Sequence, residues 1–327
     1  MSQIETGPSH CRRAVIESRN FHQHPLVETL GNQGWEIYPA YQRGKTPEVD
    51  FWLANMYSDI KQPLEFRLNV ADARRRGIPV LTWNRDAPWN LGAKSWRLWL
   101  IRNLRYLDMY LSHSMQGAER FAPELHYFPN AADTSRYNLN GSALAAMRNP
   151  NWYQHDVSFV GNIDARAHPE MRQRVALLNE IEARLKPLGI RCHFLHSAKL
   201  TSAEQIEIIQ RSRINLNVGA ACDDGPEPSW GLPERCYGIQ ACGGLLLSDF
   251  RAHARDDFEP EREWLDFQSV PQCVERIQHL LSDLQHARDI AEAAYSRVMA
   301  QHTYRHRASQ LLALVADWRK RNNHAHS

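Results

Sequence analysis

The sequence predicts an α/β protein built from two doubly wound, Rossmann-like domains in tandem. Two observations support this. The chain has 327 residues, about twice a typical single domain. Short apolar segments rich in β-forming residues alternate with amphipathic segments of about ten residues, first up to residue 129 and again from residue 157. Such alternation is typical of βαβ units, which form a parallel sheet with helices on both faces.

The first half contains six segments that we expect to be strands, each a short run of apolar, β-branched or aromatic residues. They are Ala14–Arg19, Trp35–Tyr41, Asp50–Met56, Pro79–Arg85, Met109–Ser114 and His126–Pro129. Four intervening segments have the apolar spacing of helices, namely His24–Gln33, Leu64–Arg76, Lys94–Arg105 and Met115–Phe121. Strand and helix therefore follow each other as a doubly wound domain requires.

The alternation restarts after a polar segment, residues 138–154, which contains the turn-forming pairs Asn140–Gly141 and Asn149–Pro150. We interpret this segment as the linker between an N-terminal domain, residues 1–150, and a C-terminal domain, residues 151–327. The second domain is expected to contain the strands Val157–Gly161, Cys192–His196, Ile214–Val218 and Leu245–Ser248 and the helices Pro169–Leu185, Ala203–Arg213 and Pro233–Cys242. From Val270 onward the apolar spacing is helical.

The composition is that of an ordinary globular protein, with 43% hydrophobic and 23% charged residues. The formal net charge of +2 gives no general attraction to nucleic acid. The six cysteines include no CxxC pair, which argues against a zinc site and favours reduced thiols in a cytoplasmic protein. No apolar run approaches the roughly 18 residues that cross a bilayer, and the first residues lack the apolar core of a secretion signal. We therefore expect a soluble cytoplasmic protein, attached at most to the inner face of the membrane.

The segment Ser229–Asp249 carries the most chemical information. Pro233 suits the first turn of a helix, and Glu234 complements the positive end of the helix dipole. Arg235 opposes that dipole, so an anion held by its guanidinium and by the helix N-terminus would explain its position. An ion pair with a nearby carboxylate is the alternative. The helix is expected to end at Gly243–Gly244, where glycine supplies a left-handed cap.

A resemblance favours the anion-binding interpretation. The sequence GLPERCYGIQACGGLLLSD (231–249), followed by HTYRHRASQLL (302–312), is similar to the C-terminal module of the glycosyltransferases related to spore maturation protein CgeB, a module of the group 1 type. SFVGN (158–162) and INLNVG (214–219) agree with the same family in the same order. Agreement in the first half is weaker and depends on GIPVLTWNRDAPW (77–89).

The resemblance implies a GT-B fold, in which two Rossmann-like domains face each other across a cleft. It also implies a hexosyltransferase-type enzyme of bacterial polysaccharide or glycoconjugate synthesis, with a nucleotide-sugar donor and no metal ion or other cofactor. Arg235 and the N-terminus of its helix would then stabilise the departing nucleotide diphosphate. The implied donor- and nucleotide-binding residues are Gly161, Asn162, Arg166, His196, Gly231, Leu232, Pro233, Glu234, Gly243 and Gly244.

Two of these residues have a simpler interpretation. Gly161 could be an ordinary turn glycine, and His196 a structural histidine at the end of a strand. The chain also departs from the family pattern, because Gly238 stands where the family often has a glutamate that binds ribose hydroxyls. Three acidic residues in the preceding loop are possible substitutes or plain loop acids, and these are Asp223, Asp224 and Glu227.

A catalytic group on the acceptor side is expected at the carboxyl end of a strand in the first domain. Asp86 follows the predicted strand Pro79–Arg85 and is the candidate general base. Asp–Ala–Pro is also ordinary turn chemistry. A retaining enzyme would need no protein base, and the sequence does not distinguish retention from inversion.

The segment Lys94–Leu111 combines Trp96 and Trp99 with three arginines on one predicted helix. Tryptophan with arginine on a helix is typical of contact with an anionic membrane surface. A core helix whose arginines reach out to solvent is the alternative.

Three classes of function compete. The first is a glycosyltransferase acting on a glycan, protein or small-molecule acceptor. The second is a binding or scaffold protein that kept this fold and lost catalysis, which Gly238 suggests. The third, a dinucleotide-dependent oxidoreductase, is disfavoured because no GxGxxG follows either leading strand. A role in modifying nucleic acid has no support from the net charge. The donor sugar, nucleobase, acceptor and oligomeric state are left open.

Overall fold

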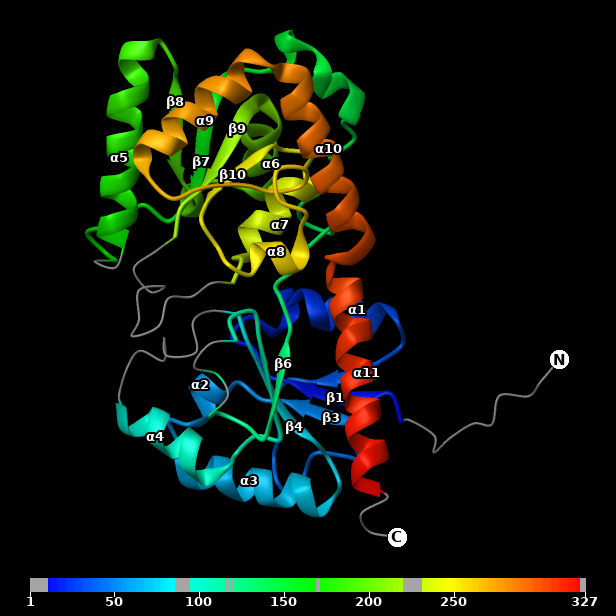
Figure 1. Ribbon diagram of the computed structural model, residues 1–327. Coiled ribbons are helices and arrows are strands. Elements are labelled where there is room, and N and C mark those ends of the chain that lie inside the picture. Colours follow the sequence, from blue (N-terminus) through cyan, green and yellow to red (C-terminus); the bar gives the residue numbers. More distant parts are fainter. Residues whose placement is uncertain are drawn as a thin grey trace, which may run out of the picture. The chain divides into compact units, whose positions relative to one another are not determined.

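The structure is a computed structural model that describes residues 11–85, 95–115, 118, 120–168, 171–219 and 231–323. The chain forms two compact α/β units (Figure 1). Unit 1 comprises Met1–Asn84, Leu91–Phe128 and Tyr304–Ser327. Unit 2 comprises Arg85–Asn90 and Pro129–Thr303.

The units divide the chain differently from the predicted boundary at residue 150. The polar segment interpreted as a linker lies inside unit 2, because its side chains are anchored there. Trp152 Nε1 donates to the carbonyl of Gln210 (2.8 Å), and Gln210 Nε2 donates to the carbonyl of Leu139 (2.9 Å). The C-terminal helix belongs to unit 1 and not to the unit that precedes it in sequence. This segment is described in full, contains no α-helix and forms two short 3-10 helices, Leu144–Arg148 and Pro150–Trp152. Turn chemistry did not show what it packs against.

Unit 1 contains a six-stranded, all-parallel sheet with the strand order β2-β1-β3-β4-β5-β6. Its strands are β1 (Arg13–Ile16), β2 (Glu36–Tyr38), β3 (Phe51–Leu53), β4 (Val80–Asn84), β5 (Met109–Ser112) and β6 (Glu124–Tyr127). Its helices are α1 (Pro25–Asn32), α2 (Met56–Asp59), α3 (Pro63–Arg75), α4 (Ser95–Leu104) and α11 (Tyr304–Asn323). Helix α1 packs against α11, whereas α3 and α4 share a buried cluster over another part of the sheet (Figure 1).

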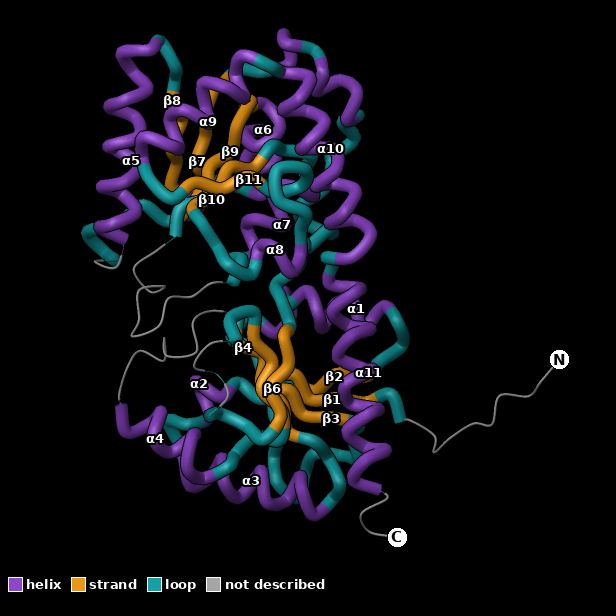
Figure 2. The backbone as a smooth tube through the Cα atoms, viewed as in Figure 1, coloured by secondary structure: helices purple, strands orange, loops and turns teal. Residues whose placement is uncertain are grey.

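Unit 2 contains a five-stranded parallel sheet with the order β11-β10-β9-β7-β8 (Figure 2). Its strands are β7 (His155–Gly161), β8 (Cys192–His196), β9 (Ser212–Asn217), β10 (Leu246–Asp249) and β11 (Leu265–Phe267). Its helices are α5 (Arg172–Leu185), α6 (Ser202–Arg211), α7 (Glu234–Ala241), α8 (Ala254–Asp257), α9 (Val270–Ser282) and α10 (Leu284–Gln301). Helix α5 packs against α9, and α7 packs against α10.

Local sequence accounts for where several helices begin. Thr201 and Glu204 form a capping box at α6, with each side chain accepting a backbone N–H of the other residue. Ser269 and Asp283 cap α9 and α10 with their side-chain oxygens. At the other end of α7, Gly243 has φ +77°, which is the left-handed cap predicted for it.

The predicted elements agree with the structure except in a few short ones. The helix predicted at Met115–Phe121 is wrong for the residues described there, since none of 115, 118, 120 and 121 is helical. The short elements α2, α8 and β11 were not predicted, because three or four residues are too few to show periodicity. No helix in the described part of the chain is long and apolar enough to cross a membrane.

Candidate functional site

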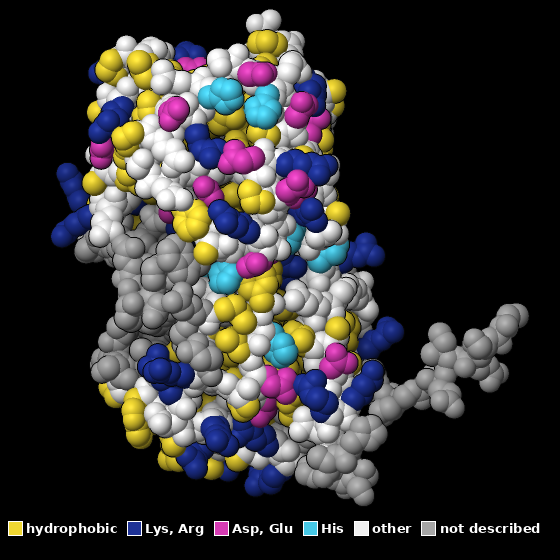
Figure 3. All heavy atoms as spheres, in the orientation of Figure 1, with side chains coloured by type: hydrophobic (Ala, Val, Ile, Leu, Met, Phe, Trp, Pro, Cys, Tyr) yellow, Lys and Arg dark blue, Asp and Glu magenta, His cyan; other side chains and the backbone are white. Residues whose placement is uncertain are grey.

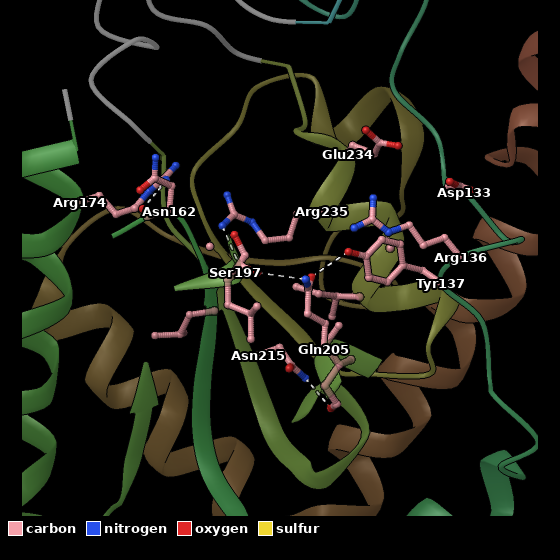
Figure 4. Close-up of a pocket in the computed structure, with 16 residues that line it drawn as sticks. Asp133, Arg136, Tyr137, Asn162, Arg174, Ser197, Gln205, Asn215, Glu234 and Arg235 are labelled. Atoms are coloured by element: carbon pink, nitrogen blue, oxygen red, sulfur yellow. Dashed lines mark hydrogen bonds between the residues drawn. The ribbon is translucent and has the colours of Figure 1, made fainter. Parts of the chain in front are cut away.

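A cavity of about 390 Å³ in unit 2 is the candidate site (Figure 4). It lies at the carboxyl ends of β7 and β9 and is enclosed by α6, the first turns of α7, and the segment 133–137. Open α/β sheets bind ligands at this edge. Four of the predicted residues line it, and they are Gly161, Asn162, Glu234 and Arg235.

Arg235, the second residue of α7, reaches across the ends of two strands. Its Nε donates to Asn217 Oδ1 (3.2 Å) and its Nη1 donates to the carbonyl of Val160 (3.2 Å). The guanidinium also lies over the ring of Phe159, 4.9 Å from the centroid. These contacts fix a positive charge at the wall of the cavity, beside the N-terminus of α7.

Gly161 leaves room for this guanidinium. A Cβ at this position would run into Arg235 Nη1 and would lie 2.7 Å from Phe159 Cζ. The sequence suggested a glycine that lets phosphates approach the backbone. In the structure the space is filled by the arginine that we expect to meet the phosphates.

Arg174 is a second cation in the cavity wall, and the sequence analysis missed it. Its side chain is 7% exposed and donates to the carbonyls of Val218 (2.9 Å) and Asn162 (3.0 Å). It thereby ties the end of β7 to the end of β9. A signal was present, because Arg174 precedes Leu178 and Ile181 on the buried stripe of α5. A charge on the apolar stripe of a helix marks a residue with buried polar partners.

The segment 133–137 supplies the opposite wall. Arg136 Nε donates to Ser202 Oγ (2.7 Å), and its guanidinium lies 5.3 Å from the ring centroid of Tyr137. The Tyr137 hydroxyl donates to Gln205 Oε1 (2.7 Å). Figure 4 shows Arg235 on one side of the cavity and Arg136 with Tyr137 on the other. These residues were missed because the predicted boundary assigned them to the other domain.

Gly238 lies in the cavity wall next to Tyr137. A Cβ added to Gly238 would meet Tyr137 Cγ at 3.6 Å, an ordinary contact distance. The ring of Tyr137 therefore packs directly against the Cα of Gly238. Glu234 is one helical turn earlier on α7 and also lines the cavity, with its carboxylate 3.4 Å from Arg85 Nη1.

The other predicted residues lie outside the cavity wall. His196 Nδ1 is 3.4 Å from both the carbonyl of Gly161 and the amide of Ile163, which fits its structural interpretation. Arg166 is exposed, and only its backbone amide is bonded to Asp164. Asp86 lies outside the described residues, as do the three loop acids. The candidate general base Asp86 is therefore not tested by the structure.

The predicted residues around α7 shape the helix. Gly231, Leu232 and Pro233 lead into it, and the carbonyl of buried Leu232 accepts from Asn130 Nδ2 (2.8 Å). Gly243 and Gly244 end it, and a Cβ on Gly244 would lie 2.7 Å from Ile209 Cγ2. These last two glycines are at the far end of α7 from Arg235.

Unit 1 has a smaller cavity, of about 240 Å³, where the loops after β1, β2 and β3 meet α3. Glu17 follows β1 and accepts the backbone amides of Tyr41 (3.0 Å) and Asn55 (3.2 Å). Burial, and then the neighbouring Glu17, raise the pKa of Asp59 to about 10. Asp59 therefore carries a proton at neutral pH. The sequence analysis did not predict this pair.

The described cysteines, Cys11, Cys192, Cys236, Cys242 and Cys273, are all free thiols. Burial raises the pKa of Cys192, Cys242 and Cys273 to about 12, so these thiols are protonated at neutral pH. Within the described ranges, no three His, Cys, Asp or Glu side chains form a group that could hold a metal ion.

Comparison with known proteins identifies the family of the chain. The model of the family described as "Glycosyl transferase-like" matches residues 143–313, just over half of the chain. The chain belongs to this family. The matched region contains every residue of the unit 2 cavity wall except those of the segment 133–137. No curated protein is similar enough in sequence to match the chain.

Solved structures share the architecture of this glycosyltransferase-family chain. HepE from Anabaena, solved with UDP, is 12% identical with a TM-score of 0.60, covering 93% of this chain and 99% of its own. A second HepE structure, with UDP-glucose, is 11% identical with the same TM-score and coverage. Sucrose-phosphate synthase from Thermosynechococcus elongatus is 14% identical with a TM-score of 0.54, covering 96% and 99%. At these identities the likeness shows the fold, which is GT-B as predicted.

Proposed function

We propose that this protein is a glycosyltransferase that binds the diphosphate of a nucleotide-sugar donor beside Arg235 in the unit 2 cavity. The observation that carries the proposal is the position of this guanidinium. It is held by Asn217 and Val160 at the ends of two parallel strands, at the N-terminus of α7, in the wall of a cavity. Membership of a glycosyltransferase family supplies the reaction class.

The chemistry requires positive charge where the glycosidic bond breaks, because the leaving nucleotide diphosphate gains negative charge there. Arg235 and the dipole of α7 meet that charge at the cavity wall. Arg174 adds a second fixed cation, held at 7% exposure by backbone carbonyls. Fixed cations can stabilise the negative charge of the leaving diphosphate as a bound metal ion would. We therefore include metal-independent transfer in the proposal.

The finer parts of the proposal concern substrate and setting. HepE was solved with UDP and UDP-glucose, which makes a uridine-linked hexose the first donor to test. The motifs shared with the CgeB-related enzymes support transfer to a bacterial glycan or glycoconjugate, in the cytoplasm where donors of this kind are made. A hydroxyl group of that acceptor would attack the sugar, with Asp86 as the proposed base if the enzyme inverts.

A thermal-shift screen with UDP, GDP, dTDP, ADP and CMP tests donor binding. A nucleotide that binds only the native state raises the melting temperature by mass action, so we expect one diphosphate to stand out from the panel. Release of nucleotide diphosphate from the matching nucleotide sugar then tests transfer. Failure of every nucleotide to raise the melting temperature would contradict the proposal.

A catalytically silent binding protein is the second candidate, and the Gly238–Tyr137 contact favours it. Gly238, which packs on Tyr137, stands where the resemblance implies a glutamate directed at ribose. This candidate predicts that nucleotides raise the melting temperature little or not at all and that no nucleotide sugar is turned over. Measured turnover would exclude it.

A further inference from the structure

Helices α3 and α4 of unit 1 present an unusual share of exposed apolar side chains. Leu64 is 71% exposed, Leu68 41%, Trp96 46% and Trp99 59%. Among the described residues only two other large apolar side chains are comparably exposed, and both lie in unit 2. Single exposed apolar residues are normal in soluble proteins, but such residues gathered on neighbouring helices mark an interaction surface.

The four side chains lie on the outer faces of their helices. Leu64 and Leu68 are four residues apart on α3, and Trp96 and Trp99 are three apart on α4, so each pair shares one face. The inner faces are already used, because Phe66 and Ile101 are buried in the unit 1 core. Both helices therefore carry apolar side chains on the inside and two more each on the solvent side, among charged residues. Core packing explains only the inner stripe.

The two helices are joined at their ends. Tyr106, which follows α4, donates its hydroxyl hydrogen to the carbonyl of Pro63 at the start of α3 (3.2 Å). Its ring stacks on Phe66 of α3, with 4.8 Å between centroids. Leu64 therefore lies next to the point where α4 ends, and Figure 1 draws α3 and α4 along the same edge of unit 1. We call Leu64, Leu68, Trp96 and Trp99 the α3–α4 face.

Basic side chains surround this face. Lys61, Arg67, Arg102 and Arg105 are exposed, and none of them forms a salt bridge with a described acidic residue. The acidic side chain exposed on α3 is Glu65, while Asp72 is engaged with Arg75. Figure 3 shows basic and apolar side chains side by side along the part of unit 1 that these helices form. The surface thus combines aromatic and aliphatic groups with a local excess of positive charge.

We propose that the α3–α4 face binds the surface of an anionic phospholipid bilayer. The tryptophans and leucines enter the interface at the level of the headgroups, where amphipathic rings are favoured. The arginines and Lys61 pair with lipid phosphates, and each basic residue near an anionic surface strengthens binding roughly fivefold. A second copy of the chain fits less well, because two copies would bring like charges together.

Membrane binding is a separate property from the proposed function, because the donor cavity lies in unit 2 and the α3–α4 face lies in unit 1. If the acceptor is carried on a lipid, binding through the α3–α4 face would place unit 1 at the membrane surface that holds the acceptor. Loss of membrane binding need not alter nucleotide binding, so the two proposals fail separately.

Flotation of the full-length protein with lipid vesicles tests this inference. Vesicles of phosphatidylcholine alone are compared with vesicles that contain about one-third phosphatidylglycerol, at low and at high salt. We expect binding to the anionic vesicles only, weakened by salt because the basic residues are screened. Equal binding to both vesicle types, or none to the anionic vesicles, would overturn the inference.

Variants locate the contact. The double variant Trp96→Ala/Trp99→Ala should lower the partition coefficient on anionic vesicles at least tenfold, and Leu64→Ser/Leu68→Ser should lower it similarly. Leu188→Ser is the matched control, because Leu188 is 47% exposed in unit 2, and it should bind like the wild type. A thermal shift with nucleotide checks that each variant is folded. If the tryptophan variant instead converts a dimer to a monomer in sedimentation, the face joins two copies and the inference is wrong.

Discussion

The two cavities lie at the same edge of the same architecture and carry opposite charge. In unit 2 the cavity after β7 and β9 is lined by three arginines and two acids, which are Arg136, Arg174, Arg235, Asp133 and Glu234. In unit 1 the cavity after β1, β2 and β3 is lined by Glu17, Asp59 and Glu65, with no Lys or Arg among its described lining residues. The parallel sheet fixes where a ligand can approach, and the side chains at that edge decide which ligand chemistry is possible.

The cavities also differ in how they accommodate charge. A guanidinium stays protonated in a protein, so Arg174 and Arg235 are stabilised by carbonyl and amide oxygens that accept their hydrogen bonds. A buried carboxyl group can instead avoid carrying a charge, because it can take up a proton. Burial raises the pKa of Asp59 to about 10, and the group becomes neutral. The cavity of unit 2 therefore retains its positive charges, whereas in the cavity of unit 1 the carboxyl group of Asp59 is neutral.

The largest expected effect concerns this neutral carboxyl. Its pKa is raised by folding, so the native state holds a proton that the unfolded chain releases above about pH 4. The free energy of unfolding should therefore fall as the pH rises from about 4 to about 10, by at most about 1.4 kcal/mol per pH unit. In Asp59→Asn this pH dependence is absent. As the pH is raised from 5 to 8, the free energy of unfolding of the variant should therefore rise by up to about 4 kcal/mol relative to that of the wild type. Urea denaturation of both proteins at pH 5 and pH 8 measures this difference. The same change in stability with pH in both proteins would contradict the raised pKa of Asp59.

The second prediction removes the charge at the unit 2 cavity. Arg235→Ala should weaken binding of the nucleotide diphosphate found in the screen by roughly 10- to 100-fold, because a charge-assisted contact to phosphate is lost. Titration calorimetry measures the change. Arg166→Ala is the matched control, since Arg166 is exposed outside the cavity wall and should bind like the wild type. Equal losses in both variants would mean that long-range charge, and not this position, governs binding.

The third prediction compares two glycines of the same cavity. Gly161→Ala should displace the Arg235 guanidinium, destabilise the protein by about 1–3 kcal/mol and weaken nucleotide binding, because the new methyl group overlaps Nη1. Gly238→Ala should be neutral or stabilising by up to about 1 kcal/mol, since its methyl group meets Tyr137 at an ordinary distance inside a helix. Chemical denaturation together with calorimetry separates the two. Similar behaviour of both variants would contradict the packing described around Gly161.

The smallest expected effect concerns the wall opposite Arg235. Tyr137→Phe removes the hydrogen bond to Gln205 and should cost about 0.5–1.5 kcal/mol of stability while leaving the ring over Gly238. Tyr137→Ala should cost more, because the ring is lost as well. A phenylalanine variant as unstable as the alanine variant would show that the hydroxyl, and not the ring, holds this wall.

The sequence predicted the regular elements well wherever they were long enough to show a period. The strand Cys192–His196 has the bounds that its apolar residues suggested, and the terminal helices follow from the spacing after Val270. The partition of those helices between the units was not predicted, because periodicity shows that a face is apolar but not which sheet covers it.

The site was predicted in part for a comparable reason. Arg235 was found because a cation in the first turn of a helix opposes the dipole, a conflict visible in the sequence itself. Arg136 and Tyr137 lie about 100 residues before Arg235 in sequence, and Glu17 lies about 40 residues before Asp59. Only the crossover of the chain between strands brings such residues together, so local patterns could not show them.

The C-terminal helix has a consequence for biosynthesis. Tyr304, Ala308, Leu311 and Val315 of α11 are buried, and Arg319 Nη1 reaches the buried carboxylate of Asp50 at 2.6 Å. A growing chain emerges from the ribosome with its amino terminus first, yet the first unit lacks this helix until unit 2 has been synthesised. The unit whose synthesis begins first is therefore completed only after unit 2, and until then the apolar surface that α11 covers is exposed to water.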